Sequence, residues 1–282
     1  MTGNGKIAQP LVAGVIGDPV GQSRSPVLHA HWLGRYGIRG HYVPLEVRPA
    51  DLAEVLRILP KMGFRGVNVT LPHKEAALRL ADTASDRAAL IGAANTLTFH
   101  GEGRIHADNT DAYGFLANMR QTVPSWDATA GPAVVLGAGG AARAVIHALL
   151  DAGAPEIRLA NRTRARAELL AEHFGARVHP VEWIEAERAL EGAATLVNTT
   201  SLGMKGKPPL RLRLEALPKS AVVADIVYTP LMTDLLIRAE AHGCRVVDGL
   251  GMLLHQAVPG FESWFGRRPE VDGDLRKAVL AG

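Results

Sequence analysis

Cysteine is nearly absent from this chain: Cys244 is the single one among 282 residues. One cysteine excludes an internal disulfide and any zinc or iron–sulfur site built from several thiolates. Histidine is more frequent, but no H-E-x-x-H pattern occurs, and His29 and His31 lie two positions apart on an expected helix, where they face different directions. We therefore expect no bound metal, and the shortage of cysteine fits a reducing compartment.

Long apolar runs and blocks of like charge are also missing. No stretch of 18 apolar residues occurs, so no transmembrane helix is expected. The apolar segment 11–17 is followed by Asp18-Pro19 rather than by a small-residue cleavage site, which favours the first β-strand of a cytoplasmic protein over an export signal. Lys and Arg number 31 against 28 Asp and Glu, without any run of five like charges. Neither a membrane nor a nucleic acid is therefore the expected partner.

The length and the apolar pattern predict two α/β domains. A chain of 282 residues suggests about two domains. In the first third, the segments 11–17, 41–47 and 66–72 resemble strands, and 26–37 and 49–63 resemble helices that begin with proline and end with glycine. This alternation predicts a parallel sheet covered by helices. Residues 96–108 then predict a β-hairpin.

A second series of strands begins at Ala133, after the polar, turn-rich segment 121–132 that is the best candidate for a domain boundary. Six strand patterns begin at residues 133, 156, 176, 195, 221 and 244, with helical patterns in most of the gaps. Such an alternation is typical of a doubly wound nucleotide-binding domain. Two more helical patterns, over residues 251–266 and 269–282, complete the chain, and periodicity does not say on which domain they pack.

A glycine-rich turn provides the clearest chemical signal. Gly137, Gly139 and Ala142 fit G-x-G-x-x-G/A between an apolar strand and an amphipathic helix. The first glycine permits the tight turn, the second lets the backbone approach a pyrophosphate, and the third small residue lets helix and strand pack closely. The helix N-terminus then attracts the phosphates. A purely structural turn is the alternative, but the flanking strand and helix favour a dinucleotide site.

The residues after the next strand indicate which dinucleotide binds. An NAD site has an acidic residue about 20 positions after the turn, bonded to the ribose 2′-OH. Here Asn161 and Thr163 alternate with Arg162 and Arg164, Arg166 follows, and no carboxylate precedes Glu168. Guanidinium groups suit a 2′-phosphate, and several arginines at a helix N-terminus without an anion are unfavourable. We therefore predict NADP as the cofactor.

Polar residues in the first domain are candidates for the substrate site. Ser23 and Ser25 precede a helix, where they can hold a carboxylate, although Ser25 before Pro26 also suits an ordinary N-cap. Asn68 and Thr70 share one face of a strand, which is either a binding face or simply a solvent-exposed one. Lys74 follows in the first turn of a helix, where a cation is disfavoured, and lysine can transfer protons.

Two further clusters flank the hairpin. The segment GAANT ends in Asn95 and Thr96, and Asp111 follows Asn109 and Thr110 at the start of a helix. Asp111 is either a helix cap or the partner of Lys74. If the two meet, a cation beside a carboxylate can share a proton with a substrate hydroxyl or carbonyl.

Nine short motifs together resemble one enzyme family. SRSPVLH, NVTLPHK, GAANT, NTDAYG, GAGGAAR, NRT, NTTSLGM, DIVYTP and GLGMLLHQA occur in the order and approximate spacing of the shikimate dehydrogenase family, over residues 23–257. The resemblance implies an N-terminal α/β substrate domain, joined by the C-terminal helices, and a C-terminal NADP-binding Rossmann domain across a cleft. We expect residues 1–110 and 250–282 in the first domain and 111–249 in the second.

The resemblance also implies a role for each site residue. Lys74 and Asp111 form the catalytic pair. The substrate is held by Ser23 and Ser25 at its carboxylate, by Asn68, Thr70, Asn95, Asp111 and Gln256 at its hydroxyls, and by Tyr228 between substrate and nicotinamide. The cofactor is held by Gly137, Ala138, Gly139, Gly140 and Ala141 at the pyrophosphate, by Asn161, Arg162, Thr163 and Arg166 at the 2′-phosphate, and by Thr199, Val227, Gly249 and Met252 at the nicotinamide.

The implied function is the reversible, NADPH-dependent reduction of 3-dehydroshikimate to shikimate, a step of chorismate and aromatic amino acid biosynthesis. The expected partner is this small molecule, bound to a monomer or homodimer. Two alternatives remain: a quinate/shikimate dehydrogenase that uses NAD, and a non-catalytic NADP-binding regulatory module. The paired serines and the arginine-rich segment oppose the first, and intact Lys74 and Asp111 oppose the second.

Overall fold

The computed structural model describes residues 9–282, which divide into two compact units. Unit 1 comprises residues up to 89, 94–108 and 257–282, and unit 2 comprises residues 90–93 and 109–256. The polar segment 121–132 lies inside unit 2, so its interpretation as a boundary is wrong. The helix over Asp111–Thr122 that precedes it already packs in unit 2 through Phe115 and Met119.

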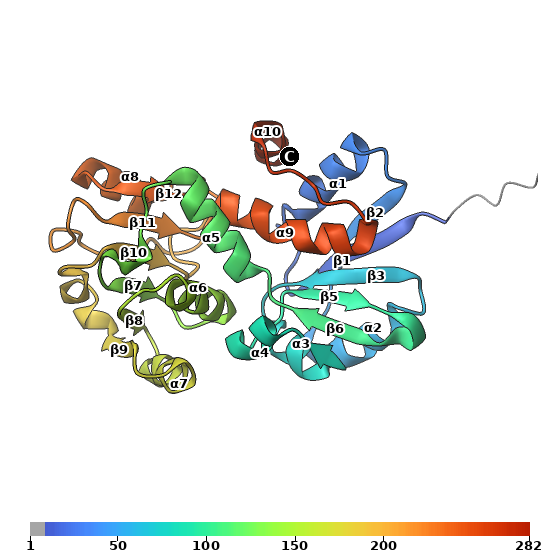
Figure 1. Cartoon of the computed structure of the whole chain (residues 1–282), viewed down its shortest axis with the longest axis horizontal. Helices are drawn as coiled ribbons and strands as arrows, with labels where there is room; N and C mark the ends of the chain where they lie inside the picture. The colour runs from blue at the N-terminus through green and yellow to red at the C-terminus, as the bar shows by residue number, and fades with distance from the viewer. Residues whose placement is uncertain (1–8) are drawn as a thin grey trace, which may run out of the picture. The chain divides into compact units, whose positions relative to one another are not determined.

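Unit 1 is built on a mixed six-stranded sheet (Figure 1). Its strands are β1 (Leu11–Gly17), β2 (Gly40–Glu46), β3 (Phe64–Val69), β4 (Thr83–Ala84), β5 (Thr96–Phe99) and β6 (Ile105–Asp108), in the order β2-β1-β3-β5-β6-β4. β1 pairs parallel with β2 and β3. β5 pairs antiparallel with β3 and with β6, which confirms the predicted hairpin.

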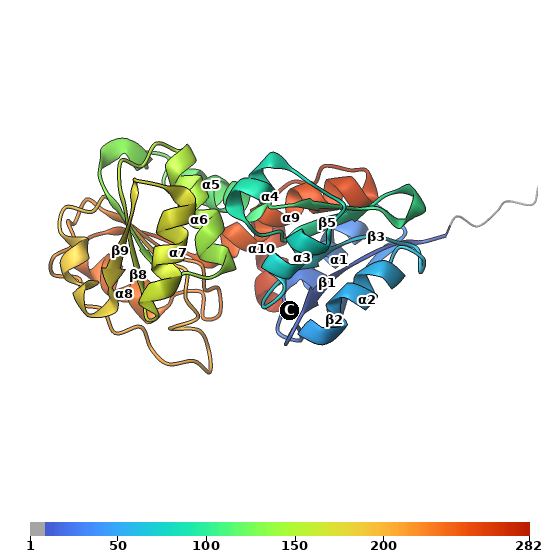
Figure 2. The ribbon, with the colours of Figure 1, turned by 90° about the horizontal axis from the view of Figure 1, so that it is seen from below.

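Helices cover both faces of this sheet, because side chains of each strand alternate between them. The helices of unit 1 are α1 (Ser25–Arg35), α2 (Leu52–Ile58), α3 (Lys74–Leu80), most of α4 (Asp86–Ile91), the end of α9 (Gly249–Phe265) and α10 (Gly273–Ala281), with short 3-10 turns at Pro49–Asp51 and Gly101–Gly103. α2 and α3 pack on the face of Ile16, Val67 and Leu97 (Figure 2). The opposite face meets α1 and α9 in an aromatic cluster that includes Trp32 and Phe261.

Unit 2 contains a fully parallel six-stranded sheet. Its strands are β7 (Ala133–Leu136), β8 (Ile157–Asn161), β9 (Val178–Glu182), β10 (Thr195–Asn198), β11 (Val222–Asp225) and β12 (Arg245–Val247), in the order β12-β11-β10-β7-β8-β9. All six strands predicted from the sequence are present. Numbered within the unit, this order is 6-5-4-1-2-3, the doubly wound arrangement of dinucleotide-binding domains.

Helices also cover both faces of the second sheet. They are α5 (Asp111–Thr122), α6 (Gly140–Asp151), α7 (Arg164–Phe174) and α8 (Asp234–His242), with 3-10 turns at Ala128–Ala130, Trp183–Glu185 and Arg188–Leu190. α5, α6 and α7 share one apolar core with the sheet. α8 and the apolar residues of the segment 186–217 form the core on the other face.

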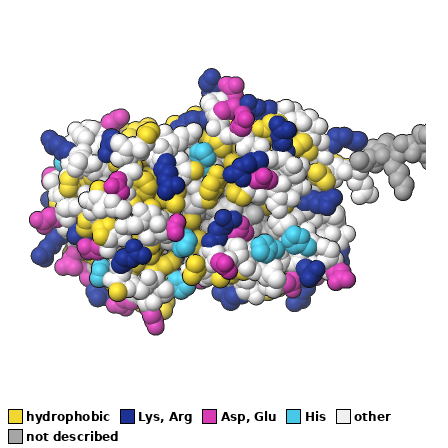
Figure 3. Space-filling view, in the orientation of Figure 1, with side chains coloured by type: hydrophobic (Ala, Val, Ile, Leu, Met, Phe, Trp, Pro, Cys, Tyr) yellow, Lys and Arg dark blue, Asp and Glu magenta, His cyan; other side chains and the backbone are white. Residues whose placement is uncertain are grey.

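Charges of both signs are interspersed on the face of the protein drawn in Figure 3, without a broad area of one sign. In the described part of the chain, residues 9–282, no helix combines the length and the apolar character that crossing a membrane requires.

Candidate functional site

The glycine turn of unit 2 has a left-handed residue and open space beside a helix N-terminus. Gly137 follows β7 with a φ of 105°, a left-handed conformation that favours glycine. A Cβ at this position would lie 2.8 Å from the Thr199 hydroxyl, so the turn also has no room for a side chain. At Gly139 a Cβ would meet no atom within 4 Å, which leaves open space beside the N-terminus of α6. Ala142 is fully buried where helix and strand pack.

The arginines after β8 do not all have the same environment. Arg164 begins α7 and binds two carboxylates, Glu168 at 2.6 Å and Glu182. Arg162 and Arg166 are exposed, and their guanidinium groups make no hydrogen bond or ion pair to the residues from 9 onward that the structure describes. The argument that three arginines here lack an anion is therefore wrong for Arg164, which has two. The two remaining guanidinium groups are available to a phosphate.

A buried amide and a buried carboxylate hold the loops that follow β10 and β11. Asn198 and Asp225 are register partners on these strands, and their side chains hydrogen-bond at 3.0 Å. Asp225 also accepts hydrogen bonds from the backbone N–H of Val227 and the hydroxyl of Thr233. Burial nevertheless raises the pKa of Asp225 to about 6. Asn198 in turn accepts from the Thr200 backbone and side chain, which fixes the loop that begins at Thr199.

Close backbone contacts bring α9 to the predicted nicotinamide residues. At Gly249, a Cβ would lie 2.7 Å from the carbonyl oxygen of Val227, so only glycine fits there. At Gly114, a Cβ would lie 2.7 Å from the Gln256 Cβ and 2.8 Å from the Met252 carbonyl oxygen. The helix α9 therefore packs tightly on α5, whose first residue is Asp111. Tyr228 is half-buried in the loop after β11.

Ser25 does not have the N-cap role that the sequence offered as an alternative. The helix begins at Ser25 itself, and no side chain caps it. Ser25 is 5% exposed, and its backbone N–H donates to the Ser23 hydroxyl at 3.2 Å. Ser25 is therefore the first residue of the helix, and its side chain lies close enough to the Tyr42 hydroxyl to influence the pKa of Tyr42.

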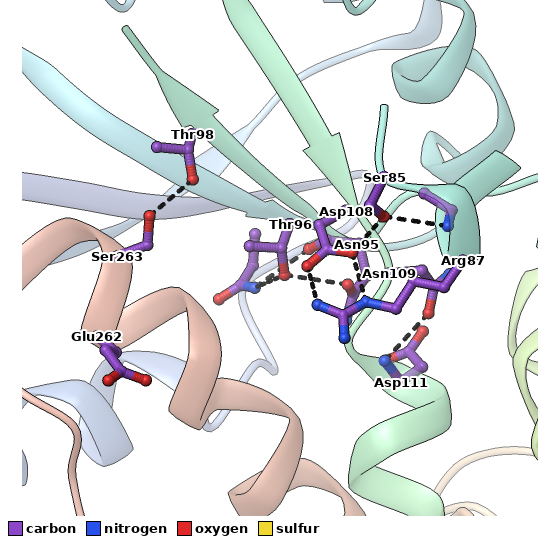
Figure 4. Close-up of polar contacts among 12 residues, drawn as sticks. Ser85, Arg87, Asn95, Thr96, Thr98, Asp108, Asn109, Asp111, Glu262 and Ser263 are labelled. Carbon is purple, nitrogen blue, oxygen red and sulfur yellow. Dashed lines mark hydrogen bonds and ion pairs between the residues drawn. The ribbon is translucent and has the colours of Figure 1, made fainter. Parts of the chain in front are cut away.

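Asn68 lies in a buried polar cluster, so its strand face is not the solvent face of the sheet. Its Oδ1 accepts from the Tyr42 hydroxyl at 2.7 Å. Its Nδ2 donates to the Asn95 carbonyl oxygen and to the Thr96 hydroxyl, each at 3.1 Å. The Thr96 hydroxyl donates to Asn95 Oδ1 at 3.0 Å (Figure 4). The residues of this cluster come from β2 (Tyr42), from β3 (Asn68), and from Asn95 and Thr96 where β5 begins.

Thr70 and Lys74 follow the same strand as it leaves the sheet. A Cβ at Gly17 would lie 2.6 Å from the Thr70 methyl group, so Thr70 packs directly against this glycine. Lys74 begins α3, and its carbonyl oxygen accepts from the N–H of Ala94, next to Asn95. His73, which precedes it, is buried and bonds the Val47 carbonyl oxygen at 2.7 Å. The start of α3 is thus fixed on both sides.

The chain leaves β6 through a second set of polar side chains. At its last residue, Asp108, the carboxylate accepts from the Ser85 hydroxyl and from the guanidinium of Arg87, each at 2.6 Å (Figure 4). Asp111 is 6% exposed and begins α5, and no side chain caps this helix, so the capping role predicted as an alternative is wrong. Its backbone N–H donates to Asn109 Oδ1 at 3.1 Å.

Each unit therefore gathers its own share of the predicted residues. In unit 1, Ser25, Asn68 and Asn95 are buried, and the Lys74 carbonyl oxygen accepts from Ala94, the residue before Asn95. In unit 2 the contacts above link Gly137 with Thr199, Val227 with Gly249, and Met252 and Gln256 with α5. Sequence reasoning missed Tyr42, Asn198 and Asp225, which bind the predicted residues, and it named Thr96 beside Asn95 without giving it a role. Thr96, Asn198 and Asp225 are polar residues within the motifs GAANT, NTTSLGM and DIVYTP, which was the signal that could have found them.

The described residues hold no candidate metal site. Among residues 9–282, no three or more His, Cys, Asp or Glu side chains are grouped so that they could hold a metal ion.

Comparison with known proteins connects these features to one family. Three family descriptions match the chain: "Shikimate dehydrogenase substrate binding domain" over residues 15–97, "Shikimate / quinate 5-dehydrogenase" over 120–205, and "Shikimate 5'-dehydrogenase C-terminal domain" over 249–279. A shikimate dehydrogenase (NADP(+)) of Paracoccus denitrificans is 66% identical over 270 residues, which is 96% of either chain.

Solved structures agree with this fold over nearly the whole length. Shikimate 5-dehydrogenase from Thermus thermophilus, in complex with NADP(H) and shikimate, is 40% identical with a TM-score of 0.85, over 96% of this chain and 99% of that one. Quinate dehydrogenase from Corynebacterium glutamicum, in complex with NAD, is 32% identical with a TM-score of 0.89, over 97% and 99% of the two chains.

Proposed function

Since this chain belongs to the shikimate dehydrogenase family, we propose that it catalyses the reversible, NADPH-dependent reduction of 3-dehydroshikimate to shikimate. The observation that carries this proposal is the 66% identity with an NADP-dependent shikimate dehydrogenase over nearly the full length of both chains. The reaction belongs to chorismate and aromatic amino acid biosynthesis.

Unit 1 supplies most of the proposed substrate site. Ser23 and Ser25 hold the carboxylate of the substrate, and Asn68, Thr70 and Asn95 hold its hydroxyls. We propose that Asp111, Tyr228 and Gln256 are substrate ligands as well. The burial of Asn68 and Asn95 supports their role, because amide groups held in a dry polar cluster present fixed donors and acceptors to a polyol.

NADP fits the residues of unit 2. The space beside Gly139 admits a pyrophosphate at the N-terminus of α6, with Ala138, Gly140 and Ala141 in the same turn. Asn161, Thr163 and the exposed guanidinium groups of Arg162 and Arg166 are proposed to bind the 2′-phosphate. Thr199, Val227, Gly249 and Met252 are proposed to line the nicotinamide, in loops that Asn198 and Asp225 hold in place.

The protein's part in the proposed chemistry is to stabilise and protonate the oxygen atom of the substrate carbonyl. Bound NADPH supplies the hydride for the C3 carbonyl carbon of the substrate. As the carbonyl is reduced, negative charge develops on its oxygen, which must receive a proton. We assign this step to the Lys74 ammonium group, which stabilises the charge and donates the proton. We assign to Asp111 the orientation of Lys74 and a hydrogen bond to a neighbouring hydroxyl.

Chain connectivity supports this pairing of Lys74 with Asp111. Asn95 donates its backbone N–H to the Asp108 carbonyl oxygen, and its neighbour Ala94 donates to the Lys74 carbonyl oxygen. Lys74 and the end of β6 therefore flank the same two residues. Asp111 follows Asp108 after only two residues, so the chain itself limits how far its carboxylate lies from that edge of the sheet.

Quinate oxidation with NAD is the second candidate, and the fold of the Corynebacterium quinate dehydrogenase favours it. An NAD site needs a carboxylate for the ribose 2′-OH at the end of the second strand. Here Asn161 stands at the end of β8, and the adjacent carboxylate, Glu182, is bound by Arg164. These features favour NADP. A non-catalytic NADP-binding module is disfavoured by the presence of Lys74 and Asp111.

A spectrophotometric assay that crosses shikimate and quinate with NADP+ and NAD+ tests the proposal through the nicotinamide absorbance. We expect shikimate with NADP+ to give the highest kcat/KM of the four combinations. A higher value for quinate with NAD+ contradicts the proposed activity, and no turnover in any combination favours the regulatory module. We further propose a cytoplasmic monomer or homodimer, which fractionation and light scattering of the full chain test.

A further inference from the structure

Two residues outside the proposed substrate site are linked to it by buried hydrogen bonds. Tyr42 lies on β2 and Asn68 on β3, with β1 between these strands, and Thr96 begins β5. Tyr42 is 8% exposed and Thr96 is 4% exposed. Buried polar groups are nearly always hydrogen-bonded, and a hydroxyl can donate only one proton, so the direction of each bond in such a cluster can be followed.

The first hydrogen bond of this cluster is donated by the Tyr42 phenol. The Tyr42 hydroxyl donates to Asn68 Oδ1 at 2.7 Å. The Asn95 carbonyl oxygen can only accept, so its bond from Nδ2 fixes which end of the Asn68 amide is the nitrogen, and the Tyr42 hydroxyl then holds the oxygen end by donating to it. Both Nδ2 protons are then used within the protein, one for the Asn95 carbonyl oxygen and one for the Thr96 hydroxyl. Any further hydrogen bond of the Asn68 amide must therefore be accepted at Oδ1.

The direction continues through Thr96. Its oxygen accepts from Asn68 Nδ2, so its own proton is directed to Asn95 Oδ1, at 3.0 Å (Figure 4). If the Asn95 amide were turned over, two amide groups would point N–H bonds at this one hydroxyl, and the bond from the hydroxyl to Asn95 Oδ1 would be lost. The relay therefore also fixes the Asn95 amide, with its Nδ2 group turned away from Thr96.

We propose that Tyr42 and Thr96 are positioning residues that set the amide orientations of Asn68 and Asn95 for the substrate hydroxyls. This inference rests on the assignment of Asn68 and Asn95 as substrate ligands. It gives the two amides complementary roles: Asn68 accepts from a substrate hydroxyl through Oδ1, and Asn95 donates to one through Nδ2. Tyr42 also lies near Ser25, one of the proposed carboxylate ligands.

Neighbouring residues provide matched controls. Thr98 is two residues along β5 from Thr96, and its hydroxyl bonds Ser263 at 3.1 Å instead of an amide of the site (Figure 4). Tyr36 also uses its hydroxyl in a single hydrogen bond, to the Glu270 backbone N–H at 3.0 Å on the surface of unit 1. T98V and Y36F therefore remove one hydroxyl each without touching the relay.

The experiment measures kcat, the KM for shikimate and the KM for NADP+ on the full-length enzyme, with thermal unfolding in parallel. We expect Y42F and T96V each to raise the KM for shikimate by about tenfold, the usual consequence of losing one buried hydrogen bond. The kcat should change by less than about threefold, and the KM for NADP+ should not change. T96S retains the hydroxyl and should restore a wild-type KM. T98V and Y36F should also resemble the wild type.

The double variant tests whether the two hydroxyls act through one relay. If they do, Y42F/T96V raises the KM for shikimate by clearly less than the product of the single effects. Multiplicative effects contradict a shared relay. A wild-type KM for shikimate in Y42F and T96V, with or without a loss of thermal stability, shows a purely structural role and overturns the proposal, as does a T96S variant as impaired as T96V.

K74A distinguishes a failed site assignment from a failed relay. If both kcat and the KM for shikimate are unchanged in K74A, the assigned site is overturned. If K74A shows a strong loss while Y42F and T96V behave as the wild type, the relay alone is overturned.

Discussion

The imidazole ring of His29 lies parallel to the phenol ring of Tyr42, with the ring centroids 3.8 Å apart and an angle of 3° between the planes. His29 is completely buried, and neither of its ring nitrogens has a hydrogen-bond partner in the described part of the chain. The rings of Trp32, Phe261 and Trp264 surround it. The histidine thus acts as an uncharged aromatic ring that holds Tyr42 in place.

Acid should destabilise the protein through His29. Burial lowers the pKa of His29 from 6.5 to about 3. Below pH 6.5 the unfolded chain binds a proton at this residue that the folded protein does not bind until about pH 3, so stability is lost as the pH falls through this window. The loss is about 1.4 kcal/mol per pH unit. His29→Phe should show a shallower decline in urea unfolding from pH 6 to pH 4, and parallel profiles contradict this. Exposed His41→Gln is the control.

Asp225 should have the opposite pH dependence. Its folded pKa of about 6 lies above the ordinary 3.8, mainly because of burial. The stabilisation that its protonated form provides is present below pH 3.8 and is lost as the pH rises through 6, by about 3 kcal/mol at most. Asp225→Asn removes this titration, so its free energy of unfolding relative to the wild type should rise from pH 4 to pH 6. Exposed Asp234→Asn should show no such trend, and a flat difference for Asp225→Asn refutes the assignment.

Lys74→Ala should lower kcat by about 10²–10⁴, because a positioned acid–base group typically contributes this much. The measurement is the steady-state rate of shikimate oxidation at saturating shikimate and NADP+. Lys277→Ala, a change at an exposed lysine of α10, should leave kcat unchanged. If Lys74→Ala raises only the KM for shikimate, Lys74 binds the substrate and does not transfer the proton.

Arg162→Ala should weaken NADPH binding by tenfold or more and NADH binding by less than twofold. The reason is that only NADPH carries the 2′-phosphate that a guanidinium binds strongly. Fluorescence titration of both cofactors measures the two affinities. Arg164→Ala is the matched control from the same segment, since its guanidinium is already bound to Glu168 and Glu182, and its loss for NADPH should be smaller. Equal losses for both variants would show a general charge effect instead of a phosphate contact.

The sequence predicted every strand of the two sheets except the two-residue β4, because apolar runs separated by turn residues are a local property of the chain. Gly137 and Gly139 were recognisable for the same reason: a left-handed turn and an open helix N-terminus depend on the residues beside them. Local spacing failed at Ser25 and Asp111. Both residue types favour N-caps, but each is instead the first residue of its helix, and its backbone N–H donates to a side chain two residues earlier.

By itself, then, the sequence determined the fold class, the two βα series and the family, since each depends on patterns of residues that are close together or in a fixed order. Only the tertiary structure decided the partners of the side chains. Tyr42 is 26 residues from Asn68, and Arg164 is 18 residues from Glu182, so no periodicity relates them. Their contacts exist because parallel strands bring distant residues into register, and burial then requires every polar group to find a partner.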